Sequence, residues 1–246
     1  MDNITEWSNA FDVKVQAFLE RPPFGIQNVD LAFDEYEKSV FLTEAQDDLV
    51  KALYNGTNEL NETFENTEEM RRCLDKLVNT YETLEAIDPS TLTDNINLFD
   101  QKNNIYTFFS TPDDRLFVIY ELVKFGSNAT QCLNNRIAGV TPCKHDELFK
   151  RLDNPFSGPN RNRVLRLNVS DNIVEIISRY EIMSYICRYI RKPSPIILVE
   201  LPDEMSIHGK STTSECELDD IIHDAILTLA VNKAIQSRSY LANRRD

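Results

Sequence analysis

The sequence lacks the motifs and runs that mark several common classes of protein. It contains none of the patterns GxGxxG, GxxxxGK[ST] and GxSxG, which argues against a nucleotide-binding enzyme and a serine hydrolase. No window approaches the 18 consecutive apolar residues of a membrane span, and the N-terminus MDNITEWSNAFD is acidic where a signal peptide is basic and then apolar. We therefore expect a protein that stays in the cytoplasm in which it is made.

Paired cysteines are also missing. The five cysteines are odd in number and irregularly spaced, so we expect reduced thiols rather than a disulfide framework. Metal ligands drawn from Cys132, Cys143 and His145, or from Cys216 and His223, lack CxxC or HxxxH spacing. A nucleophile and base two residues apart, as Cys143 and His145 are, do not generally aim at one reacting atom. We expect no cofactor, no metal and no catalysis. The cysteines are Cys73, Cys132, Cys143, Cys187 and Cys216.

What the sequence does have is an uneven distribution of charge. The net charge is −14, and residues 1–100 hold 22 acidic against 7 basic side chains. Residues 150–192 are locally basic, with nine Lys and Arg against four Asp and Glu. This polarity suits complementary packing between neighbouring copies, or a wall that repels nucleic acid. Solvated helix faces with a few salt bridges are the simpler explanation, and both stay open here.

Apolar residues recur at helical spacing through much of residues 1–94. Residues 4–19 predict an amphipathic helix that RPPFG ends at residues 21–25. A second helix is expected to open at a capping-box spacing, Thr43 to Gln46, and to run to Tyr54 before Asn55-Gly56. A third is expected over residues 66–84. The first region is therefore predicted to be an acidic helical layer.

Residues 95–216 change character and favour strands joined by short turns. A hairpin is expected around Thr111-Pro112-Asp113-Asp114, and another around Ser170-Asp171-Asn172. Pro193 and Pro195 separate the last two strands, and a short helix is expected near residues 141–152. Short turns predict an antiparallel meander. The expected strands are 104–109, 115–125, 130–137, 164–169, 173–178, 185–192 and 196–199.

The third region, residues 217–246, begins with another amphipathic pattern. Early aspartates and a late Arg238 complement the dipole of a helix that starts near Glu217. His223 lies on the flank of its apolar face and is expected to be structural. Residues 237–246 lose apolar density and are expected to form a short tail that orders against a partner. The predicted class is α+β: an N-terminal helical layer, a β meander, and a C-terminal helix.

Four stretches of the chain resemble a family of structural proteins from crAss-like tailed phages. The arrangement of a strand, Arg-Lys-Pro, a second strand and an acidic-capped helix with a histidine is the most specific part of the resemblance. The stretches are FDEYEKSVFLTEAQDDLVKALYN (33–55), VTPCKHDELFKRLDNPF (140–156), IVEIISRYEIMSYICRYIRKPSPIILVEL (173–201) and SECELDDIIHDAILTLAVNKA (214–234).

Such proteins are similar in role to the head-to-tail connector, or adaptor, proteins of short-tailed phages. The resemblance implies a virion protein at the head–tail junction that forms a homo-oligomeric ring, a dodecamer, docked to the portal. DNA would pass through its centre during ejection without specific binding. The alternative is a nucleic-acid-binding module that uses the basic patch of residues 150–192. Contacts with neighbours are expected to use Arg188, Arg191, Lys192, Arg238, Arg244 and Arg245.

Overall fold

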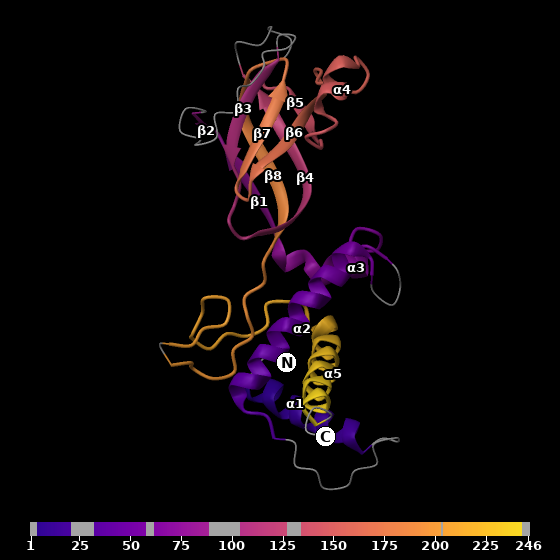
Figure 1. Ribbon diagram of the computed structural model, residues 1–246, viewed down its shortest axis with the longest axis vertical. Helices are drawn as coiled ribbons and strands as arrows, with labels where there is room; N and C mark the ends of the chain where they lie inside the picture. The colour runs from indigo at the N-terminus through magenta and orange to yellow at the C-terminus, as the bar shows by residue number, and fades with distance from the viewer. Residues whose placement is uncertain are drawn as a thin grey trace. The chain divides into compact units, whose positions relative to one another are not determined.

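In the computed structural model the chain forms two compact units (Figure 1). The helical unit is discontinuous and comprises Met1–Leu77 and Lys192–Asp246, whereas the β-rich unit is Val78–Arg191. The structure describes residues 4–20, 32–57, 62–88, 104–126, 134–202 and 204–242. Helices at both ends of the chain and a β-rich middle confirm the predicted α+β class.

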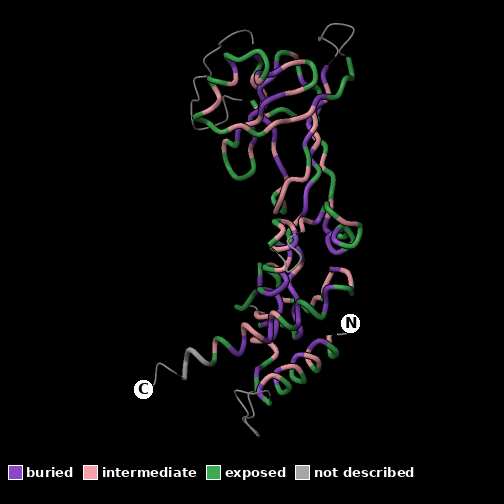
Figure 2. Tube along the Cα trace, turned by 90° about the vertical axis from the view of Figure 1, so that its right-hand side faces the viewer, coloured by how far each residue is buried: buried purple, intermediate pink, exposed green. Residues whose placement is uncertain are grey.

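The helical unit brings the first and last helices of the chain together. Helix α5 packs against both α1 and α2, and this burial fully covers Leu42, Ile226 and Leu227. Helix α1 buries Trp7 and Phe11 and leaves its opposite side exposed (Figure 2). The helices are α1 (Ile4–Leu19), α2 (Glu35–Asn55), α3 (Glu68–Leu74) and α5 (His223–Ala242), with 3-10 turns η1 (Asp75–Leu77) and η3 (Asp220–Ile222).

Helix α1 has the predicted ends, but α2 begins earlier than predicted. Its capping box is formed by Asp34 and Glu37: the Asp34 carboxylate accepts from the Glu37 N–H at 2.6 Å, and the Glu37 carboxylate accepts from the Asp34 N–H at 3.3 Å. The predicted start at Thr43 is wrong because Thr43 is buried inside the helix, where its hydroxyl accepts from the Ile196 N–H at 3.1 Å. The predicted end is confirmed, with Gly56 in the left-handed region at φ 71°.

The predicted third helix ends much sooner than its apolar pattern indicates. Helix α3 stops at Leu74, the 3-10 turn η1 follows it, and strand β1 (Val78–Thr83) begins directly after that turn. The helical prediction for this stretch is wrong because β1 pairs antiparallel with β8, from Val78 opposite Ile190 to Thr83 opposite Tyr185. Pairing with a distant strand therefore overrides a local pattern.

A single curled sheet of eight strands makes up most of the β-rich unit (Figure 1). The strand order is β1-β8-β4-β5-β6-β7-β3-β2, and all neighbouring pairs are antiparallel except β5 with β6. The sheet is therefore mixed, which departs from a simple antiparallel meander. The elements after β1 are β2 (Ala86–Ile87), β3 (Ile105–Ser110), β4 (Arg115–Phe125), β5 (Ile137–Pro142), α4 (Leu148–Asp153), β6 (Arg163–Ser170), β7 (Ile173–Ser178) and β8 (Ile182–Arg191).

Strand positions were easier to predict than strand partners. The hairpin between β6 and β7 is confirmed. The hairpin between β3 and β4 is wrong, because β3 pairs with β7 whereas β4 pairs with β8 and β5. Residues 196–199 do not form a strand: Ile196 to Leu198 are buried, Val199 is exposed, and Ile197 makes one isolated bridge to Ser214. Of the expected strand 130–137, only Ile137 lies in β5, and residues 130–133 lie outside the described residues.

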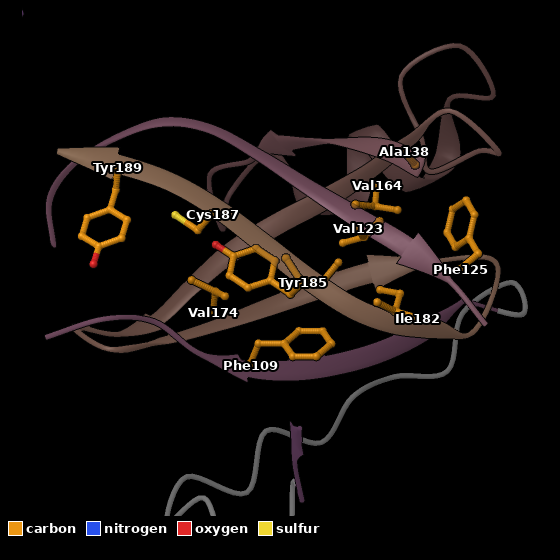
Figure 3. Packing of buried hydrophobic residues seen from close by; sticks show 11 residues of the cluster. Phe109, Val123, Phe125, Ala138, Val164, Val174, Ile182, Tyr185, Cys187 and Tyr189 are labelled. Atoms are coloured by element: carbon orange, nitrogen blue, oxygen red, sulfur yellow. The ribbon is translucent and has the colours of Figure 1, made fainter. Parts of the chain in front are cut away.

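The inner side of the curled sheet holds the main apolar cluster (Figure 3). The rings of Phe109 and Tyr185 stack there with centroids 5.5 Å apart, and Val174 lies beside them. On the other side of β6 and β7, Leu152 of α4 packs on Leu165, Leu167 and Ile177. Both sides of these two strands are therefore covered, which explains why β7 is buried along almost its whole length.

Candidate interaction surfaces

Arg188 lies on the outer face of the sheet, where β8 runs between β1 and β4. Thr80 of β1 and Tyr120 of β4 are its partners in the strand register. The Arg188 guanidinium sits over the Tyr120 ring, 5.9 Å from its centroid, and both side chains are exposed. The attraction between the cation and the ring favours one position of the Arg188 side chain on the outer face.

A polar cluster farther along the same face stabilises this surface. Lys124 donates to a Glu82 carboxylate oxygen at 2.7 Å, and the Ser184 hydroxyl donates to the same oxygen at 3.1 Å. These two hydrogen bonds, led by that of Lys124, lower the pKa of Glu82. Because they join β1, β4 and β8, they restrain the outer face around Arg188.

The other expected contact residues belong to different places. Arg191 ends β8 in the β-rich unit, opposite Arg115, and Lys192 is the first residue of the returning helical unit. Arg238 lies in α5 and donates to both carboxylate oxygens of Glu37, at 2.9 and 3.0 Å. Helix α5 continues to Ala242, so a tail that begins at residue 237 is wrong for that stretch. Arg244 and Arg245 lie outside the described residues.

The basic stretch of residues 150–192 does not form one continuous cationic surface. Arg166 is directed into the sheet, where its side chain is 11% exposed and its guanidinium donates to Glu121 at 2.6 Å. Arg151 donates to Glu147 at 3.0 Å, and Arg163 donates to backbone carbonyl groups. At least three of the nine basic side chains therefore have partners within the chain, which weakens the case for a phosphate-binding face.

Two exposed aromatic side chains lie in the segment between β5 and β6, residues 143–162. They were not predicted from the sequence. Phe156 is 90% exposed and Phe149 is 52% exposed. The sequence does carry a signal for the exposure of Phe156. This residue lies in a loop bounded by Pro155 and Gly158, where no periodic pattern of apolar residues assigns it to a core. Their exposure makes these two side chains candidates for contact with another molecule.

The described cysteine and histidine side chains that were considered as metal ligands or catalytic groups make separate contacts. His145 contacts the Asn168 carbonyl at 3.0 Å, whereas the Cys143 thiol donates to the Lys144 carbonyl at 3.3 Å. His223 is buried against Trp7 with ring centroids 5.0 Å apart, and burial lowers its pKa. The four cysteines within the described residues are free. Burial raises the pKa of the Cys216 thiol to about 11, so it stays protonated at neutral pH.

Two classes of site do not occur in the part of the chain that the structure describes. Within residues 4–20, 32–57, 62–88, 104–126, 134–202 and 204–242, no group of three or more His, Cys, Asp or Glu side chains is arranged to hold a metal ion. Among the same residues, no helix has the length and apolar character needed to cross a membrane.

Comparison with known proteins gives matches along the whole chain. A family model described as phage tail ring protein 3/4 matches residues 1–246. A protein of Bacteroides phage crAss001 named Ring protein 3 is 41% identical over 242 residues, which is 98% of this chain and 98% of the relative. Ring protein 4/5 of the same phage is 30% identical over 241 residues, 94% of this chain and 92% of the relative.

Proposed function

Since this chain belongs to the phage tail ring protein 3/4 family, we propose that twelve copies of it form a closed ring in the portal-proximal part of a crAss-like phage tail. The predicted membership of a structural family of crAss-like phages is confirmed. The chain is a virion structural protein whose role is assembly with other tail components. The copy number, the docking to the portal and the passage of DNA through the ring are the parts we propose.

The observation that carries this proposal is the extent of the match. Similarity to Ring protein 3 covers 98% of both chains, so it includes the helical unit and the β-rich unit together. A family assignment that rested on one unit would say nothing of the surfaces on the other. Here the match includes residues of both units.

Charge supports the passage of DNA through the ring. Cationic side chains that neutralise phosphates release counterions, and this release gives DNA-binding proteins much of their affinity. A chain with a net charge of −14 and a strongly acidic first hundred residues has the opposite character. An acidic wall around a channel repels the duplex and lets it slide.

The contact residues expected from the sequence are retained as part of the proposal. Arg188, held on Tyr120, and the neighbouring Arg191 and Lys192 would meet an adjoining tail protein. Arg238 would play a smaller part because Glu37 already pairs with it. Arg244 and Arg245 are proposed on sequence alone.

Electron microscopy of the purified protein, alone and mixed with the portal protein of its own phage, tests the ring directly. We expect rings with twelvefold symmetry, stacked on the portal when it is present. The assembled rings should also not bind DNA at physiological salt. Solitary molecules under both conditions would refute the ring, and a ring of another symmetry would refute the copy number.

The competing function, a nucleic-acid-binding module built on residues 150–192, predicts a different result. Binding of double-stranded DNA would weaken steeply as salt is raised, because each phosphate contact releases counterions. Replacing Arg188 by alanine would then reduce both the affinity and the salt dependence. The inward direction of Arg166 favours the ring over this module.

A further inference from the structure

Glu175 of β7 is a buried carboxyl group that its surroundings leave partly unbonded. The residue is 3% exposed, and its Oε1 atom has no hydrogen-bond partner among the described residues. Its partners in the strand register are both apolar, Phe108 of β3 and Leu167 of β6. Ionisation is costly in such a place, because no described donor replaces the water that Oε1 has lost.

The segment between β5 and β6, residues 143–162, packs on the face of the sheet that carries Glu175. Leu167 lies directly opposite Glu175, so the two side chains share this face. Leu152 of the segment is buried in one apolar cluster with Leu167. The segment is therefore a cover for this part of the sheet. The other members of the cluster are Leu165, Ile177, Tyr106, Cys143 and Leu148.

Main-chain hydrogen bonds fasten the cover at its two ends. The Cys143 N–H donates to the Arg166 carbonyl at 2.8 Å, and the Asn162 carbonyl accepts from the Gly139 N–H at 2.9 Å. Between these ends, the His145 ring contacts the carbonyl oxygen of Asn168 at 3.0 Å. Asn168 follows Leu167, the residue opposite Glu175, so water drawn to an ionised carboxylate there disturbs the contact of the cover with β6.

Few charged groups act on Glu175. Burial raises its pKa to about 7, and the nearby His145 of the cover offsets part of that increase. Cys143 and Tyr106 bring the other titratable side chains of the cluster, and burial raises the pKa of the Cys143 thiol, which therefore stays neutral. Glu147 of the cover is paired at 3.0 Å with Arg151 of the same segment.

We propose that residues 143–162 form a pH-sensitive cover, closed on the sheet while Glu175 is protonated and open locally once Glu175 is ionised. Opening lets water reach the carboxyl, so the open form has an ordinary carboxyl pKa and binds fewer protons than the closed form. Opening therefore becomes easier as the pH rises from about 4.5 to about 7, and levels off above that. Phe149 and Phe156 belong to the cover, so its opening also changes the outer surface of the β-rich unit.

Hydrogen exchange of the purified full-length protein, followed by mass spectrometry, measures the opening. Protection factors, which remove the intrinsic effect of pH on exchange, are compared at pH 5 and pH 8 for peptides from residues 143–157 and from β8. Protection of the cover should fall at least about tenfold over this interval, and at pH 8 it should be lower than that of β8. Glu175→Gln should keep the cover protected at pH 8, because glutamine cannot ionise.

Glu82→Gln is the matched control, since the pKa of Glu82 is lowered and this variant should lose protection as the wild type does. Equal protection of the wild-type cover at pH 5 and pH 8, or the same loss in E175Q, would overturn the inference. A common protection factor for the cover and β8 at pH 8 would overturn it too, because Glu175 would then act only through global unfolding. The wild-type comparison decides even if E175Q fails to fold, and none of these results depends on ring formation.

Discussion

Replacing Glu121 with alanine is expected to destabilise the β-rich unit by about 3–5 kcal/mol, because it leaves a buried cation without its counter-charge. Glu121 is 5% exposed and accepts hydrogen bonds from the Arg166 guanidinium, at 2.6 Å, and from the Tyr185 hydroxyl. The Arg166 Nε already makes no hydrogen bond with a described residue. Burial, with Glu121 next in importance, raises the pKa of Tyr185, so this hydroxyl stays a neutral donor.

Urea unfolding followed by circular dichroism measures this loss. The matched control is Glu82→Ala, which removes an ion pair with Lys124 whose side chains are 43% and 30% exposed. Its cost should stay below about 1 kcal/mol, as is usual for exposed pairs. Joint replacement of Glu121 by leucine and Arg166 by methionine should recover much of the stability, because no unpaired charge then remains. A loss from E121A as small as that from E82A would show that the buried pair contributes little.

The second large effect concerns Glu175, where Glu175→Gln is expected to make the protein more stable than the wild type at pH 8. Glu175 is 3% exposed, and its Oε1 atom has no hydrogen-bond partner among the described residues. Phe108 and Leu167 are its neighbours on the flanking strands. Burial raises its pKa to about 7, and the nearby His145 offsets part of that increase.

The sign of the pH dependence follows from this raised pKa. Below about pH 4.5 the carboxyl is protonated in both the folded and the unfolded chain, so it contributes no difference. Between about pH 4.5 and 7 the unfolded chain ionises first, and the free energy of unfolding falls as the pH rises. Above about pH 7 the cost levels off at no more than about 3 kcal/mol.

Urea unfolding at pH 5 and pH 8 tests the prediction for Glu175. The wild type should lose stability between these values, and E175Q should lose less, because glutamine cannot ionise. Glu82→Gln is the control, since the pKa of Glu82 is lowered and its replacement should not reduce the loss. Equal losses for E175Q and the wild type would show that Glu175 ionises in the fold as readily as in water.

Local signals in the sequence predicted the elements that depend on nearby residues. Helix α1 ends where expected because its apolar repeat stops before two prolines. The start of α2 was misplaced because a capping-box spacing also occurs inside the helix, at Thr43, where the hydroxyl bonds to a distant segment. A pattern of four residues does not distinguish these two situations.

Features that depend on partners far along the chain could not be predicted from the sequence. Residues 78–83 carry apolar positions that continue a helical pattern, yet they pair with β8, which lies far along the chain. Basic residues in β6 alternate between the two faces, so Arg166 enters the core although its charge predicts a surface position. The exposure of Phe156 depends on how its loop is bonded to Arg163, which no local pattern encodes.

The placement of α5 against α1 and α2 has a consequence for biosynthesis. Lys233 of α5 bonds to Asp48 of α2, and Lys14 of α1 bonds to Thr228 of α5, so two early helices are held by a helix that is translated well after them. Until α5 has been made, a nascent chain leaves the apolar sides of α1 and α2 open. This unit therefore completes its fold only after the whole intervening β-rich unit has been translated.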